Sequence, residues 1–584
     1  MKKFKFSKKL IVITTLLLMI VIGCTVTFTQ LTLPTDATSD CNNTITSTIF
    51  NTWFASGSVS LNGVVNPANS VTFSANSLCS FYAWSEQMFL WLTSPAPKTY
   101  GGGGGLVINS GAFYDISPQD STGARTFISH QPGLIRAFNV RAAQHGAHDL
   151  PVIMEKKTLR LLEILNPVIS KNGKQLILNA AGQAVEIGSA KLIEGKKPVL
   201  FDLKGAEIKG PKAIIHSDFD EKTKLVNAKV LQRADFDNTD LVEKIVINGR
   251  PAFFDLNGNV INVETGQAGD GSVLMAQNGS LVYYITLAND VYAYFRTMQG
   301  ASVPSGTKFP TNQTGLNSVI AFAAAHGKTF VDPNALAIEV KSSWVEAAGL
   351  PDSAKFITMM ATVPTYDKSI ANNWKPNGQK TVLLAMVGMH VVGAVGGAGV
   401  PPFASPNGHP EMLWATFEHV SNTPDTSYTY TKTPSGTGSE PMSTAGSWVF
   451  CAAGAGEPFN VPHMRDSSGH IVIEPGFTIS PSNTLRVMPF GMPGSSASSN
   501  AEIITINNSV RSFLINGDLR KNYIQTGTTW TIGGASPNGS NEVGTNHLAN
   551  STMETYQLGS NCFDCHGTNT TNVSHVFSDI KPLF

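Results

Sequence analysis

The sequence predicts a β-rich α+β protein with a body of several parts and a short, chemically distinct C-terminal segment. The 584 residues are enough for about three domains. Glycine and proline are frequent (53 and 32 residues), only 14% of residues are charged, and short runs of Val, Thr and Tyr lie between turn residues. That pattern is typical of strands joined by loops. A mostly apolar stretch from 80 to 92 instead predicts a helix that ends before Ser94-Pro95.

The N-terminus predicts export. An apolar run from Leu10 to Gly23 is short for a membrane span and follows a basic region made of Lys2, Lys3, Lys5, Lys8 and Lys9. Val21-Ile22-Gly23-Cys24 resembles a bacterial lipobox, so residues 1–23 are predicted to be a lipoprotein signal and Cys24 to carry lipid. The alternatives are cleavage by an ordinary signal peptidase and an uncleaved anchor.

We therefore expect the protein in the periplasm or cell envelope, with Cys24 as its lipid anchor to a membrane. Thr25 follows this cysteine where an aspartate would favour retention in the inner membrane, so the outer membrane is expected in a Gram-negative host. No other stretch contains the 18 or so uninterrupted apolar residues that a spanning helix needs.

The mature chain is expected to have four parts. Residues 24–154 begin the main body, 155–264 form a charged insert rich in β-hairpins, 265–540 complete the main body, and 541–584 form the C-terminal segment. The insert is predicted from its high density of charges and from short apolar runs that follow Asn172-Gly173, Glu194-Gly195 and Asn248-Gly249. These copies are too uneven in spacing for a solenoid.

Four further elements are predicted in the main body. Asn278-Gly279, between the apolar runs 271–275 and 280–284, predicts a hairpin. Val319 to His326 and Ser342 to Ala348 are expected to be helical. Thr381 to Val392 is a buried core element, either a pair of strands or a helix.

The C-terminal segment contains the pattern Cys562-Phe563-Asp564-Cys565-His566. Cys-x-x-Cys-His predicts one covalently attached haem c, with Cys562 and Cys565 as the thioether-forming residues and His566 as the proximal iron ligand. A zinc site is disfavoured because the sequence has no second ligand pair at this spacing. A redox disulfide is disfavoured because the pair lies near the C-terminus rather than at a helix start in a βαβ unit.

Three cysteines remain: Cys41, Cys79 and Cys451. In an oxidising compartment two of them are expected to pair, which leaves one buried thiol. Cys41 and Cys79 are the nearer pair in sequence, but spacing does not decide the connectivity.

The second axial iron ligand is open. Met553 would raise the reduction potential, whereas His575 would lower it. More distant options are His390, His419, His463 and His547. An empty sixth position is a further alternative, and it would permit chemistry with peroxide, O₂ or another small ligand. Glu418 beside His419 does not predict an acid–base pair, because adjacent residues point in different directions in a strand or a helix. We expect His419 to be a core histidine held by a hydrogen bond.

Charge and motifs exclude several functions. The formal net charge is zero and no dense basic run follows the N-terminal signal, so nucleic-acid binding is not expected. The sequence contains no Gly-x-Ser-x-Gly elbow and no His-Glu-x-x-His helix. Nothing therefore predicts a hydrolase or a protease.

Three sequence segments outside the haem motif resemble those of a known family: Phe89 to Pro95, Trp414 to His419, and Leu548 to Thr555. Together with Cys-x-x-Cys-His they resemble a group of exported bacterial cytochrome c family proteins, over most of the chain except the charged insert. The resemblance implies an exported haem protein without an assigned substrate. We do not expect a stand-alone small cytochrome c fold, because only 18 residues follow His566 in this sequence. The haem is therefore expected to pack on the preceding body.

From these features we expect an exported c-type haem protein that acts in one-electron transfer with a periplasmic redox partner. Whether it is also an enzyme stays open. The alternatives are a haem-dependent periplasmic oxidoreductase or peroxidase-like enzyme, and a haem-bearing binding or sensor protein.

Overall fold

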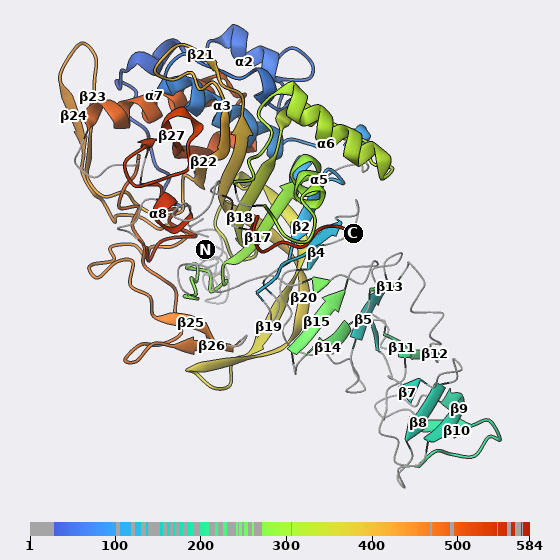
Figure 1. Cartoon of the computed structure of the whole chain (residues 1–584). Helices are drawn as coiled ribbons and strands as arrows, with labels where there is room; N and C mark the ends of the chain where they lie inside the picture. Colours follow the sequence, from blue (N-terminus) through green and yellow to red (C-terminus); the bar gives the residue numbers. More distant parts are fainter. Residues whose placement is uncertain are drawn as a thin grey trace, which may run out of the picture.

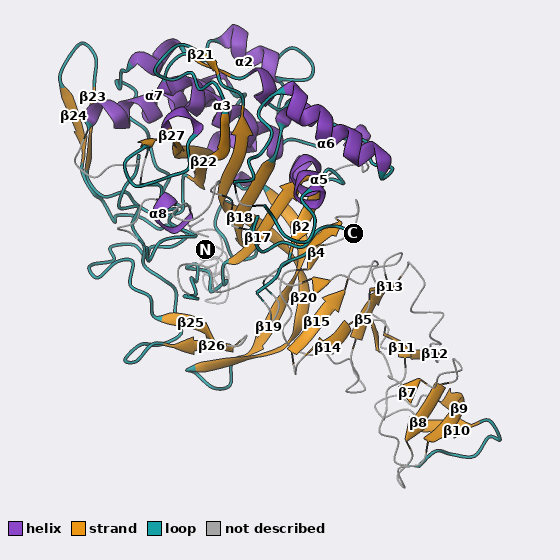
Figure 2. Ribbon diagram, in the orientation of Figure 1, coloured by secondary structure: helices purple, strands orange, loops and turns teal. Residues whose placement is uncertain are grey.

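The computed structural model has the β-rich α+β architecture that the sequence predicts (Figure 2). It describes residues 28–100, 105–117, 119, 123–129, 136–137, 152–155, 161–163, 168–169, 175–178, 184–191, 199–209, 216–219, 226–229, 241–242, 244–247, 250–254, 260–261, 271–304, 306–467, 470–490, 496–545, 547–557, 562–566, 574 and 576–584. The predicted signal, residues 1–23, and Cys24 lie outside these residues. None of the helices within them has the length and apolar character needed to cross a bilayer.

A large sheet organises the molecule (Figure 1). Its main path is antiparallel and runs in the order β28-β27-β22-β20-β18-β17-β2-β3. The strands of this path are β2 (Phe113–Ile116), β3 (Phe127–Ser129), β17 (Tyr283–Asn289), β18 (Ile338–Glu346), β20 (Asn373–Val395), β22 (His409–His419), β27 (Tyr523–Thr531) and β28 (Glu542–Gly544). Strand β19 (Thr358–Asp367) pairs with β20, and so does β26 (His470–Ile473), which also pairs with β25 (Met464–Ser467).

Helices α3 (Leu78–Leu92) and α7 (Ala497–Phe513) pack against one face of this sheet at β27. Phe81 of α3 stacks on Trp530 of β27, with ring centroids 3.9 Å apart, and Phe89 stacks on Phe417 of β22 at 4.3 Å. The predicted helix at 80–92 is thus confirmed, and its aromatic side chains belong to the core. Helix α2 (Ser47–Trp53) contacts α7.

The opposite face of the sheet carries a second apolar cluster. Because side chains alternate along a strand, Leu413 and Ala415 of β22 join the core under α3, whereas Met412 and Trp414 point to the other side. There they meet helices α5 (Asp290–Met298) and α6 (Gln313–Ala325) and the short helix α8 (Cys562–His566). The sheet therefore separates two cores, and α8 belongs to the second.

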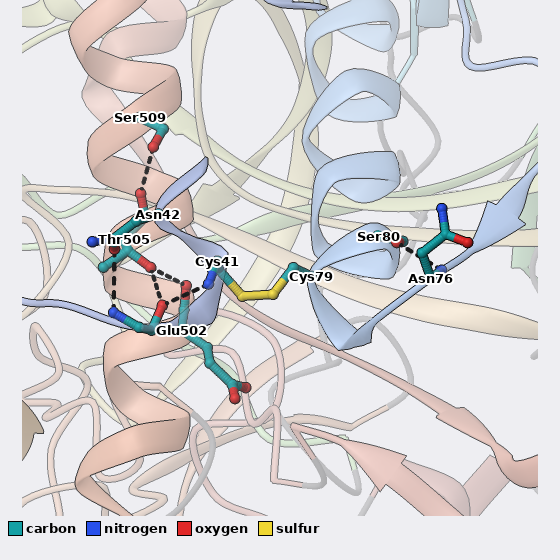
Figure 3. Close-up of a disulfide and its surroundings, with 9 residues drawn as sticks. Cys41, Asn42, Asn76, Cys79, Ser80, Glu502, Thr505 and Ser509 are labelled. Carbon is teal, nitrogen blue, oxygen red and sulfur yellow. Dashed lines mark hydrogen bonds between the residues drawn. A yellow bond between two sulfur atoms is a disulfide. The ribbon is translucent and has the colours of Figure 1, made fainter. Parts of the chain in front are cut away.

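The disulfide left open by the sequence joins Cys41 to Cys79 (Figure 3). It ties the turn at Asp40–Asn43 to the first turn of α3, and Ser39 next to it shares a 2.6 Å hydrogen bond with Thr505 of α7. Cys451 is the remaining cysteine of the three and is buried. Burial raises the pKa of its thiol to about 11, so this thiol is a poor nucleophile at neutral pH.

Between Val152 and Ile261 the described residues form short strands in three small antiparallel sheets, in agreement with the predicted hairpins. Their orders are β10-β9-β8-β7, β12-β11-β6-β5-β13 and β14-β15-β16. The strands are β5 (Val152–Glu155), β6 (Leu161–Glu163), β7 (Val168–Ile169), β8 (Gln175–Leu178), β9 (Ala184–Lys191), β10 (Val199–Asp202), β11 (His216–Phe219), β12 (Val226–Lys229), β13 (Leu241–Val242), β14 (Lys244–Ile247), β15 (Arg250–Phe254) and β16 (Val260–Ile261). As far as they are described, they pair only with one another.

The helix predicted at Ser342 to Ala348 is wrong, because most of this stretch belongs to β18. Trp344 points into the core under α3 and Val345 into a cluster on the other face, so both faces of this strand are buried. A strand buried on both faces lacks the alternation of polar and apolar residues that identifies strands in a sequence. The stretch 381–392 is part of the single long strand β20, so it is neither the helix nor the pair of strands that the sequence suggested.

Candidate functional site

The Cys-x-x-Cys-His residues form the short helix α8. Helical geometry turns the chain by about 100° per residue, so positions 562, 565 and 566 lie along one side of the turn. Phe563 leaves the turn in another direction and is buried in the second core at 1% exposure. Cys562 is partly buried against the same core. Phe563 therefore anchors the helix and leaves the cysteine and histidine positions on a separate side.

His566 lies against Trp414 of β22. The imidazole and indole rings are stacked, with centroids 4.7 Å apart and planes inclined by 29°. Trp414 is 2% exposed and also makes an edge contact with the ring of His390 on β20, at 5.5 Å. The two strands are hydrogen-bonded neighbours. The predicted iron ligand His566 thus packs on a side chain of the central sheet.

The segment before α8 crosses the sheet on the same face. Asn550 donates from Nδ2 to the carbonyl of Phe417 at 3.2 Å, and Ser551 donates from its backbone N–H to Glu418 Oε1 at 2.8 Å. Further along, the hydroxyl of Thr552 shares a 2.6 Å hydrogen bond with Ser343, and its carbonyl accepts one from Tyr284 at 2.7 Å. These contacts extend over β22, β18 and β17. The segment Leu548 to Thr555 therefore crosses the sheet, and we call it the strap.

Gly388 of β20 makes room for this strap. A Cβ atom at this position would lie 2.6 Å from Thr552 Oγ1, 2.8 Å from Ser343 Oγ and 2.9 Å from Asn550 Oδ1. These separations are shorter than van der Waals contact. The strap can therefore approach the sheet this closely only over a glycine.

Glu554 at the end of the strap contacts the side chains of His390 and Lys341. His390 Nε2 lies 3.0 Å from its Oε2, and Lys341 Nζ lies 3.5 Å from its Oε1. The Nδ1 atom of His390 is 2.8 Å from the hydroxyl of Thr416, so both ring nitrogens are engaged. Burial alone would raise the pKa of Glu554, but the charges of His390 and Lys341 and the hydrogen bond outweigh it and hold the pKa at about 2.

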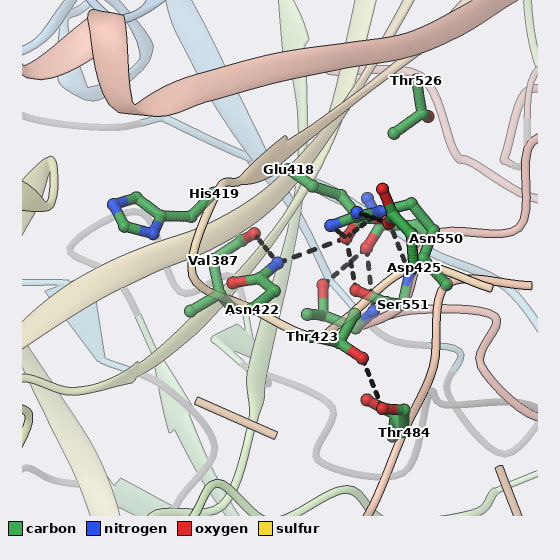
Figure 4. Close-up of polar contacts among 12 residues, drawn as sticks. Val387, Glu418, His419, Asn422, Thr423, Asp425, Thr484, Thr526, Asn550 and Ser551 are labelled. Carbon is green, nitrogen blue, oxygen red and sulfur yellow. Dashed lines mark hydrogen bonds and ion pairs between the residues drawn. The ribbon is translucent and has the colours of Figure 1, made fainter. Parts of the chain in front are cut away.

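A second, fully buried network fixes the strap to β22 (Figure 4). Arg486 donates from Nε and Nη2 to Glu418 Oε2 at 3.2 and 3.1 Å, and from Nη1 to Asp425. Ser551 donates its hydroxyl to the same Glu418 oxygen. Burial would lower the pKa of Arg486, but Asp425 and Glu418 raise it, so the guanidinium stays charged. The buried charge of Glu418 therefore serves structure.

His419 is a core histidine, as expected, and it does not act with Glu418. Its ring stacks on Phe356 at 3.7 Å, while Nδ1 accepts a hydrogen bond from the N–H of Ser421 at 3.2 Å. Figure 4 shows its ring pointing away from the network around Glu418. Burial lowers the pKa of His419 to about 3, so this residue is neutral at ordinary pH.

The described residues after α8 are anchored as well. Ser574 donates to Glu339 Oε2 at 2.5 Å and shares a 2.6 Å hydrogen bond with the hydroxyl of Tyr292 on α5. Phe577 packs among aromatic rings of the second core, and Arg296 donates from Nε to its carbonyl at 2.9 Å. Described residues both before and after α8 in the sequence are therefore anchored to the body of the protein.

The candidates for a second iron ligand lie in different places. Met553 is fully buried in a third apolar cluster, with Tyr284 and Val387, rather than in the core that holds Phe563. His463 is engaged by the carbonyls of Ser480 and Val461. His575 lies outside the described residues, as does the side chain of Cys565. Met553 and His575 thus stay predictions.

The residues around α8 fit a covalently attached haem. The donor set consists of two cysteine positions and one imidazole along one side of a helical turn, which is what two thioethers and a proximal ligand require. Trp414 and Phe563 add aromatic surface next to them. The sequence motif identified the donor set, but Trp414 and the strap could not be assigned to it from spacing alone. No group of three or more His, Cys, Asp or Glu side chains in the described part of the chain is arranged to hold a metal ion.

Comparisons of the chain with protein-family models, with curated proteins and with solved structures found no match, so the geometry around α8 carries the functional proposal.

Proposed function

We propose that this chain is an exported c-type haem protein that passes single electrons to or from a periplasmic redox partner. The observation that carries the proposal is the helical Cys-x-x-Cys-His turn, with its histidine stacked on Trp414 and its Phe563 buried in the core. Haem attached here would supply one-electron Fe(III)/Fe(II) chemistry.

The chain's own residues hold and shield the group. Cys562 and Cys565 would form the thioethers, and His566 would hold the iron. Trp414 fixes the orientation of the His566 ring, and the apolar side chains around Phe563 exclude water from one side. The strap and the residues after α8 keep the turn in one place, which limits the rearrangement that accompanies a change of iron charge. A low reorganisation cost favours electron transfer.

Location follows from the N-terminus. Residues 1–23 would direct export, and Cys24 would anchor the protein, in a Gram-negative host at the outer membrane. Covalent haem attachment in bacteria takes place outside the cytoplasmic membrane, which agrees with export.

The test is expression of the full chain in a host with a c-type haem maturation system. We expect a polypeptide mass raised by one haem, and a pyridine haemochrome spectrum typical of two thioether bonds. The double variant Cys562→Ser/Cys565→Ser should lose both signals, and Cys451→Ser, at a buried free thiol outside the motif, should keep them. An unmodified mass for the wild-type chain would overturn the proposal.

Carbon monoxide separates electron transfer from the second candidate, a haem enzyme or sensor. A reduced protein that does not bind carbon monoxide has both axial positions filled by protein ligands and is suited to electron transfer. Binding of carbon monoxide at an open site would instead support an oxidoreductase, a peroxidase-like enzyme or a sensor.

A further inference from the structure

We propose that His547 would supply the second protein ligand of the haem iron, in addition to His566. The inference rests on the proposed function, since it concerns the iron that the Cys-x-x-Cys-His turn would hold. Two observations carry it. The buried Nδ1 atom of His547 has no hydrogen-bond partner among the described residues, and His547 lies on the stretch of chain that leads from β27 to the strand of Trp414.

The position of His547 follows from the anchors on either side. Thr545 is fixed to β27, where its N–H donates to the carbonyl of Thr528 at 2.8 Å. Asn550 is fixed to β22 through the carbonyl of Phe417. The residues between these anchors therefore pass from β27 to β22.

The crossing lies on the face of the sheet that carries α8. Leu548 is buried in the second core together with Trp414 and Phe563. In the register of the sheet, Trp414 pairs with Thr529, and Thr529 pairs with Gly544. Since neighbouring strands are about 4.8 Å apart, Gly544 begins the crossing about 10 Å from Trp414. Asn550 lies on β22 again, through the carbonyl of Phe417, and the ring of His566 rests on Trp414 of the same strand.

The ring of His547 lacks the partners that a structural histidine has. The residue is half-buried, and its Nδ1 atom is buried without a hydrogen-bond partner among the described residues. A buried polar atom without a partner is costly and rare in native proteins. A ligand that the protein chain does not itself provide, such as iron, would satisfy the ring.

The other described histidines of the main body are less suitable. His390, His419 and His463 use their ring nitrogens in hydrogen bonds within the protein. His409 has a buried Nε2 without a partner, but its ring packs against Phe81 of α3, on the far side of the sheet. His547 combines a buried Nδ1 atom that has no partner among the described residues with a place in the chain next to Leu548 of the second core.

The experiment compares single variants of the matured, haem-loaded full chain. His547→Ala is set against Met553→Leu and His575→Ala, which remove the two ligands suggested by spacing. The readouts are electron paramagnetic resonance and near-infrared magnetic circular dichroism of the ferric protein, with covalent haem measured by mass in every sample. We expect the wild-type iron to be low-spin with two histidine ligands. His547→Ala should lose the low-spin signal, become high-spin and bind carbon monoxide when reduced, while the other two variants keep the wild-type spectrum.

Two additions keep the test decisive. Exogenous imidazole should restore the low-spin signal of His547→Ala, and His547→Met should give a methionine–histidine spectrum; neither is expected from a misfolded protein. An unchanged low-spin spectrum in His547→Ala, or a high-spin wild type, overturns the ligand assignment while the haem protein stands. A wild type without covalent haem overturns the proposed function itself.

Discussion

The ring of His566 stacks on the indole of Trp414, 152 residues earlier in the chain, at a centroid distance of 4.7 Å. Helix α8 has only five residues, too few to be stable in isolation. Its conformation therefore depends on contacts with the sheet. Trp414 also touches His390, which in turn binds Glu554 of the strap. The attachment turn and the strap before it thus meet at one tryptophan.

Replacing Trp414 should weaken the packing of helix α8 and of the strap against the sheet. For Trp414→Ala we expect a loss of about 3–5 kcal/mol in the free energy of unfolding, because a large buried side chain leaves a cavity. Trp414→Phe keeps an aromatic surface under His566 and should lose much less. Urea unfolding of both variants measures the difference. Equal losses in the two variants would show that the stacking surface is unimportant.

Part of this site was visible in the sequence because it is local. Cys562, Cys565 and His566 lie within five positions, and the helix at 80–92 is a continuous apolar run that ends at a proline. The contacts that hold the site are not local: His390 and Glu554 are 164 positions apart. No periodicity in either stretch indicates that the two meet. The residues Leu548 to Thr555 stand out in the sequence through the family resemblance. The structure gives their physical role, which is to form hydrogen bonds with polar side chains on one face of the sheet.

The wrong prediction of a helix at Ser342 to Ala348 also results from contacts between residues distant in sequence. Ser342 and Ser343 are polar residues of a fully buried strand, and each has a specific partner. Ser343 binds Thr552 of the strap, and Ser342 accepts from the indole N–H of Trp344. Polar residues that serve such contacts obscure the pattern from which strands are predicted.

Gly388 should be irreplaceable. In Gly388→Ala the new Cβ would lie 2.6 Å from Thr552 Oγ1 and force the strap away from the sheet. We expect a loss of about 1–3 kcal/mol in stability, together with faster proteolysis of the strap itself. The matched control is Gly456→Ala, where a Cβ meets nothing within 4 Å, and it should change stability by less than about 0.5 kcal/mol. Resistance of the alanine variant to protease at the wild-type level would contradict the role of Gly388.

Glu418 should be essential for folding rather than for chemistry. Glu418→Gln keeps the side-chain volume but removes the charge that binds Arg486 and accepts from Ser551. Breaking a buried ion pair leaves a charge without compensation, so we expect a loss of about 3–5 kcal/mol. The exposed Glu457→Gln is the control and should be neutral within about 0.5 kcal/mol. Thermal unfolding of the two variants beside the wild type gives the comparison, and a loss below about 1 kcal/mol would refute the prediction.

Glu554 should make the fold sensitive to acid. Its pKa is about 2 in the folded protein against an ordinary value of 4.5, because the charges of His390 and Lys341 outweigh the opposing effect of burial. A carboxyl group with a lowered pKa stabilises the fold above its ordinary pKa, and this stabilisation is lost as the pH falls from 4.5 toward 2. A difference of this size corresponds to about 3 kcal/mol at neutral pH.

Glu554→Gln should therefore be less stable than the wild type by about 3 kcal/mol near neutral pH, and the two should converge as the pH falls through the interval from 4.5 to 2. Urea unfolding of both proteins at a series of pH values from about 7 down to about 3 measures this convergence. Glu457→Gln, at an exposed glutamate, should follow the wild-type curve throughout. A constant difference between Glu554→Gln and the wild type across that range would mean that the carboxylate charge is not what holds the strap to His390 and Lys341.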